Sequence, residues 1–305
     1  MPELPEITSR AREMNASLAG KTITAIDIVQ PKCLNLPPAK FAAALRNARI
    51  RSVANRGKWI FVDTTKGWLL LNLGMGGELL FRDRTRLPEK RRLVFEFDDG
   101  TCLAVNFWWF GYAHFVPASG LGRHKMTSAL GPNAIDLTEA DLGAKIHGRR
   151  GGVKAFLLDQ SNLAGIGNAY IHDILFLAGL HPKRSLESLS DPEVAGLARA
   201  IRDGLLPSIK KGGAFYELNL RGRKGGFAKE DILVGYREGE PCPKCGTKIA
   251  KIKTGGTSSF ICPQCQPAKP RGRARRAGKV VPKRGKGSSK RVVRRTRERA
   301  PRRRA

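Results

Sequence analysis

The sequence predicts an α+β protein with an N-terminal helix, a β-sandwich or barrel, a helical middle section and a C-terminal zinc ribbon. Three observations support this fold class: strand-like runs separated by turn residues up to about residue 130, helical spacing of apolar residues beyond it, and two C-x-x-C pairs near the end of the folded part. The 305 residues are enough for more than one hydrophobic core.

The N-terminal section begins with a predicted helix. Ile7, Ala11, Met14 and Leu18 recur at helical spacing, and Gly20 is placed to end the helix. Short runs rich in β-branched and aromatic residues then predict strands at 22–29, 58–64, 67–73, 92–100, 101–107 and 112–116.

The middle section is predicted to be helical. A helix starts near Thr138, another covers 169–180, and a long one follows a capping box formed by Ser190 and Glu193. Between the first two lies SNLAGIGNAY (161–170), whose glycines give a tight turn in front of a helix. Free backbone N–H groups at such a place suit a phosphate, and a plain helix–helix connection is the alternative.

Four of the six cysteines indicate a metal site. They form CPKC (242–245) and CPQC (262–265), separated by sixteen residues, which is zinc-ribbon spacing. The predicted ligands of one structural Zn²⁺ are Cys242, Cys245, Cys262 and Cys265. We expect Cys33 and Cys102 to pack as small hydrophobic residues.

The charge of the chain indicates a polyanionic partner. Lys and Arg outnumber Asp and Glu by 56 to 26, which gives a net charge of +30 and favours nucleic acid or an anionic membrane surface. No run is long and apolar enough to span a bilayer, and the acidic N-terminus is unlike a secretory signal, so we expect a cytoplasmic protein. Residues 267–305 hold 18 basic residues and one acidic residue, Glu298, and we expect a disordered basic tail that binds phosphates non-specifically.

Several segments together resemble one family. They are PELPEI (2–7), NRGK (55–58), LGMGGEL (73–79), LLDQSNLAGIGNAYIHDILFLAGLHP (157–182), and REGEPCPKCG with FICPQCQ (237–266). Over 2–266 the chain is similar to the formamidopyrimidine-DNA glycosylase and endonuclease VIII family of base-excision repair enzymes, and closer to the first branch. The resemblance implies a two-layered β-sandwich domain (1–130), a helix-two-turn-helix domain (131–235) and a zinc finger (236–266). It also implies a monomer, associated with the nucleoid, that acts on damaged duplex or single-stranded DNA.

The resemblance assigns the chemistry to the first residues of the chain. In the family Met1 is removed, and the secondary amine of Pro2 attacks C1′ of the damaged nucleoside. The resulting iminium supports base release and then β- and δ-elimination of the strand. An α-amine has a pKa of about 8, so a useful fraction is neutral at physiological pH. Glu3 is implied to be the acid/base, and Lys58 to contact the phosphate beside the lesion.

The resemblance also implies DNA contacts away from the nucleophile. Glu6 would be a secondary active-site carboxylate, with a simple helix N-terminal charge as the alternative. Asn168, helped by the backbone of Gly167, would bind a phosphate, and Lys154 would lie near the lesion.

A further set of implied DNA contacts concerns the opened base pair. Because the target base leaves the stack, the family fills the void with a methionine, here Met75, and wedges an aromatic residue, here Phe110, beside the orphaned base. The family usually reads the opposite cytosine with an arginine in this segment. In NFWWFG (106–111) the corresponding DNA-binding residues are Trp108 and Trp109, which stack on any base and offer no guanidinium. We therefore expect a weakened preference for cytosine.

Two further positions depart from the family pattern. The finger arginine that clamps the lesion phosphate is replaced by Thr257, which carries no charge unless Lys251 or Lys253 reaches in. The histidine that usually precedes the LGM motif is Asn72, which keeps a neutral donor.

The leading hypothesis is a bifunctional DNA glycosylase and abasic-site lyase for oxidised bases. The alternative is a lesion- or abasic-site-binding protein of the same fold with weak or no base excision. A zinc-ribbon RNA-binding or transcription protein would leave the first six residues unexplained.

Overall fold

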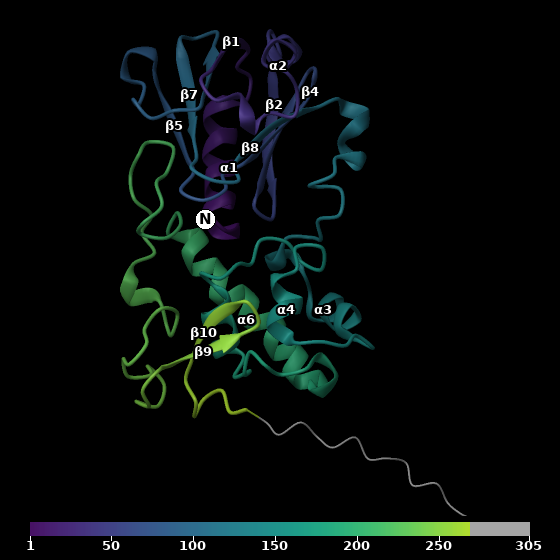
Figure 1. The fold of residues 1–305 in the computed structure, drawn as a ribbon, viewed down its shortest axis with the longest axis vertical. Helices are drawn as coiled ribbons and strands as arrows, with labels where there is room; N and C mark the ends of the chain where they lie inside the picture. The colour runs from purple at the N-terminus through teal and green to yellow at the C-terminus, as the bar shows by residue number, and fades with distance from the viewer. Residues whose placement is uncertain (269–305) are drawn as a thin grey trace, which may run out of the picture. The chain divides into compact units, whose positions relative to one another are not determined.

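The computed structural model describes residues 1–268 (Figure 1). The predicted basic tail, 267–305, lies outside the described residues apart from its first two positions. No helix within residues 1–268 is long and apolar enough to cross a membrane.

The N-terminal part is a sandwich of two four-stranded antiparallel sheets, and the predicted α+β class is confirmed. One sheet has the strand order β1-β6-β7-β5 and the other β2-β3-β4-β8. The strands are β1 (Ile23–Ile28), β2 (Ile50–Arg56), β3 (Trp59–Thr64), β4 (Gly67–Asn72), β5 (Glu78–Asp83), β6 (Leu93–Phe97), β7 (Thr101–Asn106) and β8 (Tyr112–Val116). Strands β2 and β5 and the helix α2 (Pro38–Leu45) were not predicted.

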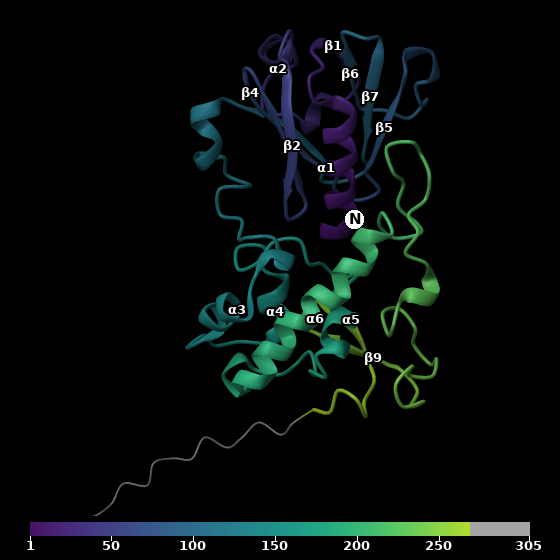
Figure 2. The same cartoon turned by 180° about the vertical axis from the view of Figure 1, so that it is seen from behind.

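Helix α1 (Leu4–Leu18) runs between the two sheets (Figures 1 and 2). Its predicted apolar stripe is buried in one cluster with residues of both sheets. Burial of each large apolar side chain contributes about 1.5–3 kcal/mol, so this packing fixes the helix. Leu4, the first residue of α1, instead joins the core of the helical part, and so the chain start is held where the two parts meet.

The helical part consists of α3 (Glu139–Ile146), α4 (Val153–Leu158), α5 (Ile171–Leu177) and α6 (Asp191–Lys210). Helix α4 was not predicted. Helix α5 is shorter than the predicted 169–180, and Gly179, with a φ of +64°, lies just beyond its end, where a left-handed residue commonly terminates a helix.

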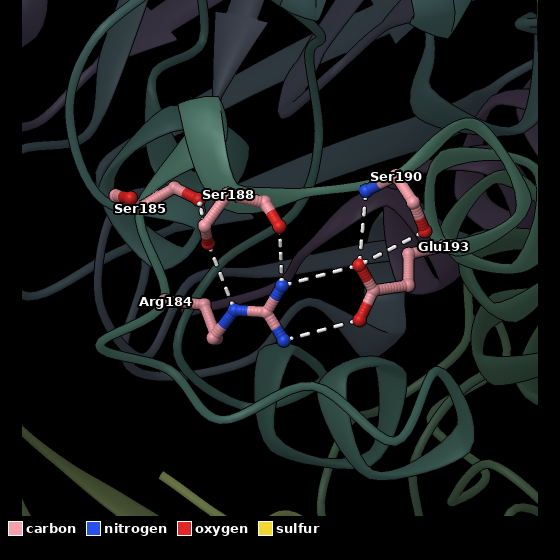
Figure 3. Close-up of polar contacts among 5 residues, drawn as sticks. All are labelled: Arg184, Ser185, Ser188, Ser190 and Glu193. Atoms are coloured by element: carbon pink, nitrogen blue, oxygen red, sulfur yellow. Dashed lines mark hydrogen bonds and ion pairs between the residues drawn. The ribbon is translucent and has the colours of Figure 1, made fainter. Parts of the chain in front are cut away.

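The start of α6 confirms the predicted capping box. The backbone N–H of Ser190 donates to Glu193 Oε2 at 2.9 Å (Figure 3). Glu193 is also held by both terminal nitrogens of Arg184, each 3.1 Å from a carboxylate oxygen (Figure 3). This bidentate pair orients the first turn of α6.

The last described segment is a small cysteine-containing module. Its hairpin pairs β9 (Ala250–Thr254) with β10 (Thr257–Ile261), and β10 packs on α5. A separate apolar cluster, which includes Cys242 and Cys262, supports it. Cys33 and Cys102 are both buried, and Cys33 belongs to the apolar cluster of the sandwich. The three domain boundaries stay predictions.

Candidate active site and DNA interface

A pocket of about 540 Å³ lies at the start of α1. Its lining includes Met1, Glu3, Lys58 and Asn168, so the structure brings together residues that are far apart in the sequence. The segment 215–237 completes the lining.

Pro2 and Glu3 lie at the chain start, next to this pocket. Pro2 is buried, and Met1, which is bonded to its nitrogen, is 54% exposed and lines the pocket. The Glu3 carboxylate accepts hydrogen bonds from the backbone N–H groups of Gly167, at 2.7 Å, and Ala169, at 2.9 Å.

The environment of Glu3 changes its proton affinity. Burial raises the pKa of Glu3, against the lowering effects of Lys58 and of the two N–H donors. The carboxyl group therefore holds a proton at higher pH than an exposed glutamate, which suits a general acid.

Gly167 is the point where Glu3 and Lys58 meet. A Cβ built on Gly167 would lie 2.2 Å from Glu3 Oε1 and 2.4 Å from Lys58 Nζ, so a larger residue here would displace the ends of these side chains. The Gly167 N–H is bonded to Glu3, and the expected help of the Gly167 backbone in phosphate binding stays a prediction.

Lys58 lies in the turn between β2 and β3, next to Asn72 at the end of β4. Asn72 donates its Nδ2 to the Lys58 carbonyl at 3.1 Å and accepts from the Gly74 N–H at 3.0 Å. Asn72 thus joins the turn that holds Lys58 to the loop that carries Met75.

Glu6 is a buried hub beneath the pocket rather than part of its lining. One oxygen accepts from the Tyr170 hydroxyl at 2.5 Å and the Ala214 N–H at 3.1 Å, and the other accepts from the Glu3 N–H at 2.9 Å. Tyr170 also bonds Ser208 of α6 at 2.6 Å. Glu6 therefore ties the backbone beside Pro2 to two distant segments, which neither sequence interpretation of Glu6 anticipated.

Asn168 lines the pocket and contacts Tyr236. Its Nδ2 lies 3.2 Å from the Tyr236 hydroxyl, while its Oδ1 is buried without a hydrogen-bond partner among the described residues. Phosphate binding by Asn168 stays a prediction.

Lys154 is placed under the zinc-finger hairpin. It is 4% exposed, and its Nζ donates to the hydroxyls of Thr257 at 2.9 Å and Ser259 at 2.8 Å and to the Ser258 carbonyl at 2.8 Å. Burial lowers the pKa of Lys154 to about 8. The ammonium of Lys154 faces the hairpin, and its expected place near the lesion stays a prediction.

Thr257 is exposed at the start of β10. The charge nearest to its hydroxyl comes from Lys154 beneath it, while Lys251 lies over the Phe260 ring at 5.9 Å. The Thr257 contact with DNA stays a prediction.

Met75 and the aromatic residues form an exposed second cluster. We call residues 107–111 the wedge loop. Met75 exchanges two backbone hydrogen bonds with it, from its N–H to Trp109 O at 2.9 Å and from the Trp108 N–H to its carbonyl at 3.1 Å. Trp108, Trp109 and Phe110 are 67%, 65% and 69% exposed. Their side chains are thus available to a ligand, as the wedge role requires.

The four predicted zinc ligands converge. The Cys242–Cys265, Cys245–Cys262 and Cys245–Cys265 sulfur pairs are 3.9, 3.4 and 3.5 Å apart. A tetrahedral ion with Zn–S bonds of about 2.3 Å requires sulfur separations of about 3.8 Å. The cluster fits one structural zinc ion.

Sequence patterns missed several residues of this site. Tyr170, Ser208 and Ala214 hold Glu6, and Phe215, Tyr216 and Tyr236 line the pocket. No local signal could reveal them, because Tyr170 and Ala214 lie 164 and 208 positions from Glu6.

Comparison with known proteins identifies the family. Three family models match: the formamidopyrimidine-DNA glycosylase N-terminal domain at residues 1–106, its H2TH domain at 129–218, and a zinc finger found in these glycosylases and in IleRS at 239–268.

Whole-chain relatives agree. The formamidopyrimidine-DNA glycosylase of Pelotomaculum thermopropionicum is 34% identical over 88% of this chain and all of its own length, and that of Chloroflexus aggregans is 36% identical over 87% and 98%. A Lactococcus lactis Fpg bound to abasic-site DNA superposes with a TM-score of 0.80 at 26% identity, covering 87% of this chain and all of that one. Another Lactococcus lactis Fpg complex, with N7-benzyl-Fapy-dG DNA, gives 0.79 at 27%, covering 88% and all. The matching family models and these relatives show that the chain belongs to the formamidopyrimidine-DNA glycosylase family.

Proposed function

We propose that this protein is a bifunctional DNA glycosylase and abasic-site lyase for oxidised bases, with Pro2 as nucleophile. One observation carries the proposal: the residue after Pro2 is a buried carboxyl group, next to a lysine amine, at a pocket. Relatives that are 34% and 36% identical to this chain are named formamidopyrimidine-DNA glycosylases, and a similar solved protein is bound to Fapy-dG DNA.

The chemistry follows from the positions of these groups. Once Met1 is removed, the Pro2 amine attacks C1′ and the damaged base leaves with the glycosidic electron pair. Glu3 donates its proton to the sugar ring oxygen, and the ring-opened iminium forms. Loss of the C2′ proton then expels the 3′ phosphate, and a second elimination expels the 5′ phosphate. Lys58 is placed to bind a phosphate beside the lesion.

The test is borohydride trapping of the full chain on oligonucleotides that contain 8-oxoguanine, formamidopyrimidine, an oxidised pyrimidine or an abasic site, in duplex and single-stranded form. Intact mass first establishes that Met1 is absent. We expect a covalent adduct with at least one damaged base. A Pro2→Gln variant, in which intact mass shows Met1 retained, is the control and should form none.

The alternative of a lesion-binding protein rests on the hairpin. Thr257 is uncharged where the family has an arginine, and the nearby Lys154 ammonium is enclosed. Specific binding to abasic DNA with no adduct on any substrate would favour this alternative and contradict the proposal. An adduct with the abasic site alone would show that the protein has lyase activity but does not excise these damaged bases.

A further inference from the structure

Residues 213–227 form a folded loop that reaches from the end of α6 to β5, and we call it the anchor loop (Figure 1). Its two ends are held together, since the Phe215 N–H donates to the Phe227 carbonyl at 2.9 Å and the Phe227 N–H to the Gly213 carbonyl at 3.0 Å. Its tip, Leu220, is 2% exposed and belongs to the apolar cluster of the sandwich, whereas Phe227 belongs to that of the helical part. The anchor loop therefore connects the two parts of the protein.

One face of α1 carries the polar groups that hold the anchor loop. Glu6 accepts from the Ala214 N–H at 3.1 Å, and Glu13, two turns further along the helix, accepts from the Leu220 N–H at 2.9 Å. Arg10 lies between them on the same face, because positions 6, 10 and 13 have helical spacing. Arg10 thus stands between the two points at which α1 holds the loop.

The Arg10 guanidinium is enclosed without hydrogen-bond partners at its end. Arg10 is 2% exposed, and neither of its terminal nitrogens makes a hydrogen bond within residues 1–268. Glu13 lies 3.6 Å from one of them, which is beyond hydrogen-bond length, and both oxygens of Glu6 are occupied by other donors. A buried charge without hydrogen bonds is costly, so its presence indicates a partner that arrives in another state of the protein.

Glu217 is the matching anion. It is the one acidic residue of the anchor loop, and its carboxylate makes no hydrogen bond within residues 1–268. Its backbone is fixed, because its N–H donates to the Ala214 carbonyl at 2.9 Å and its carbonyl accepts from the Gly225 N–H at 3.0 Å. Burial and the Glu6 charge raise the pKa of Glu217 to about 7, against the lowering effects of the chain's amino group and of Arg10. A closer contact with Arg10 would stabilise the charged carboxylate.

Glu217 directly follows the two residues of the anchor loop that line the pocket. These are Phe215 and Tyr216, whose rings contact each other with centroids 5.1 Å apart. Tyr216 is 52% exposed, so the protein covers only about half of it. A guanidinium and a carboxylate can form two parallel hydrogen bonds, which fix orientation as well as distance. Such a pair at Glu217 would fix the backbone from which both rings project.

The consequence rests on the proposed function, in which a damaged base leaves the duplex and enters the pocket. We propose that Arg10 is a positioning residue, whose guanidinium pairs with Glu217 in the DNA-bound protein and so holds Phe215 and Tyr216 against the extruded base. Aromatic rings stack on a base, and a sugar that has lost its base offers them no such partner. The pair therefore supports base excision and has no part in strand cleavage at an abasic site.

The experiment measures two single-turnover rates for each full-length variant at saturating protein. One is base excision from a duplex with a damaged base that wild type releases, and the other is strand cleavage of a duplex with an abasic site. We expect Arg10→Met and Glu217→Gln each to lower base excision about ten- to hundredfold and to keep abasic-site cleavage within about threefold of wild type, because only the first reaction needs the rings in place. Arg10→Lys keeps the charge and should restore part of the excision rate.

The Arg10→Met/Glu217→Gln double variant tests whether the two residues act as a pair. Its excision rate should be close to those of the single variants, because each single substitution already breaks the same interaction. The matched controls are Arg12→Met, at an exposed position of α1, and Glu187→Gln, at an exposed position outside the pocket. Both controls should keep the two wild-type rates.

Three results would overturn this inference while the proposed function stands. The first is excision at the wild-type rate by Glu217→Gln. The second is a double variant in which the losses of the two single variants multiply, since the residues would then act independently. The third is an equal loss of base excision and abasic-site cleavage, which general damage to the fold would cause. If wild type releases no damaged base at all, the glycosylase part of the proposed function fails, and the inference with it.

Discussion

Two buried charged centres of this protein are built in opposite ways. The acidic centre, Glu3 and Glu6, is satisfied mainly by backbone N–H groups of Gly167, Ala169 and Ala214. The basic centre, Lys154, is satisfied mainly by hydroxyl groups of a single hairpin. The acidic centre joins three segments around the pocket, whereas the basic centre joins α4 to β9 and β10.

This difference decides how each centre responds to substitution. Substitution at a donor position leaves its backbone N–H in place, so the carboxylates keep their partners unless the backbone itself moves. A hydroxyl acceptor is removed by one substitution. We infer that the acidic centre is the rigid part of the site and that the basic centre is the part that can be tuned.

The largest expected effect comes from Glu3→Gln. The amide keeps the size of the side chain but cannot donate a proton to the sugar, so single-turnover base excision should fall about 10²- to 10⁴-fold. The Kd for a duplex that carries a tetrahydrofuran abasic analogue at the lesion position should change little. Glu139→Gln, an exposed glutamate in the first turn of α3, is the matched control. Base excision by Glu3→Gln above a tenth of the wild-type rate would show that Glu3 is not the general acid.

Gly167→Ala tests whether the backbone is the rigid element. The added Cβ would overlap both the Glu3 carboxylate and the Lys58 amine, and displacement of reacting groups by about 1 Å costs about a hundredfold in rate. Gly196→Ala in α6, where a Cβ meets no atom within 4 Å, should keep full activity. Equal activities of the two variants would show that the site tolerates movement.

Lys154→Met tests the basic centre through its pH dependence. The folded protein holds the Lys154 proton less tightly than the unfolded chain, because its pKa is lowered to about 8. Stability of wild type relative to the variant should therefore rise between about pH 8 and pH 10 and decline as the pH falls through 8. Chemical denaturation at each pH measures the difference, which we expect to reach about 1–3 kcal/mol.

The matched control for this titration is Lys125→Met, which removes an exposed lysine. Its stability difference from wild type should be independent of pH over the same range. If the stability difference between wild type and Lys154→Met is also independent of pH, the Lys154 ammonium is not enclosed in solution.

The smallest expected effect is that of Tyr170→Phe. It removes the one side-chain donor to Glu6 among residues 1–268 and leaves Ser208 without that partner, at a cost of about 1–2 kcal/mol in stability. Base excision should fall only a fewfold, because the Ala214 and Glu3 N–H groups still hold Glu6. If base excision fell as much as in Glu3→Gln, Glu6 would take part in the reaction itself and would not only position other groups.

Local patterns predicted the elements whose signals are complete within a few residues. Strand 112–116 and the α6 capping box were predicted correctly because strand-forming residues and cap residues give their signals within a few positions. Strand β2, IRSVANR, was missed because only Ile50 and Val53 of its residues are buried, so its polar face hides the pattern. Helix α4, with six residues, is too short to show a period.

The sequence by itself determined the family, the zinc ligands, the nucleophile candidate and the helix caps, since each is written in adjacent residues with fixed spacing. The tertiary structure alone decided that the Gly167 N–H bonds the Glu3 carboxylate, that Glu6 is a hub and that Lys154 faces the hairpin. Those outcomes depend on contacts over 164, 208 and about a hundred positions. Such contacts are set by how separate apolar cores pack, because burial fixes which backbone groups each charge must use.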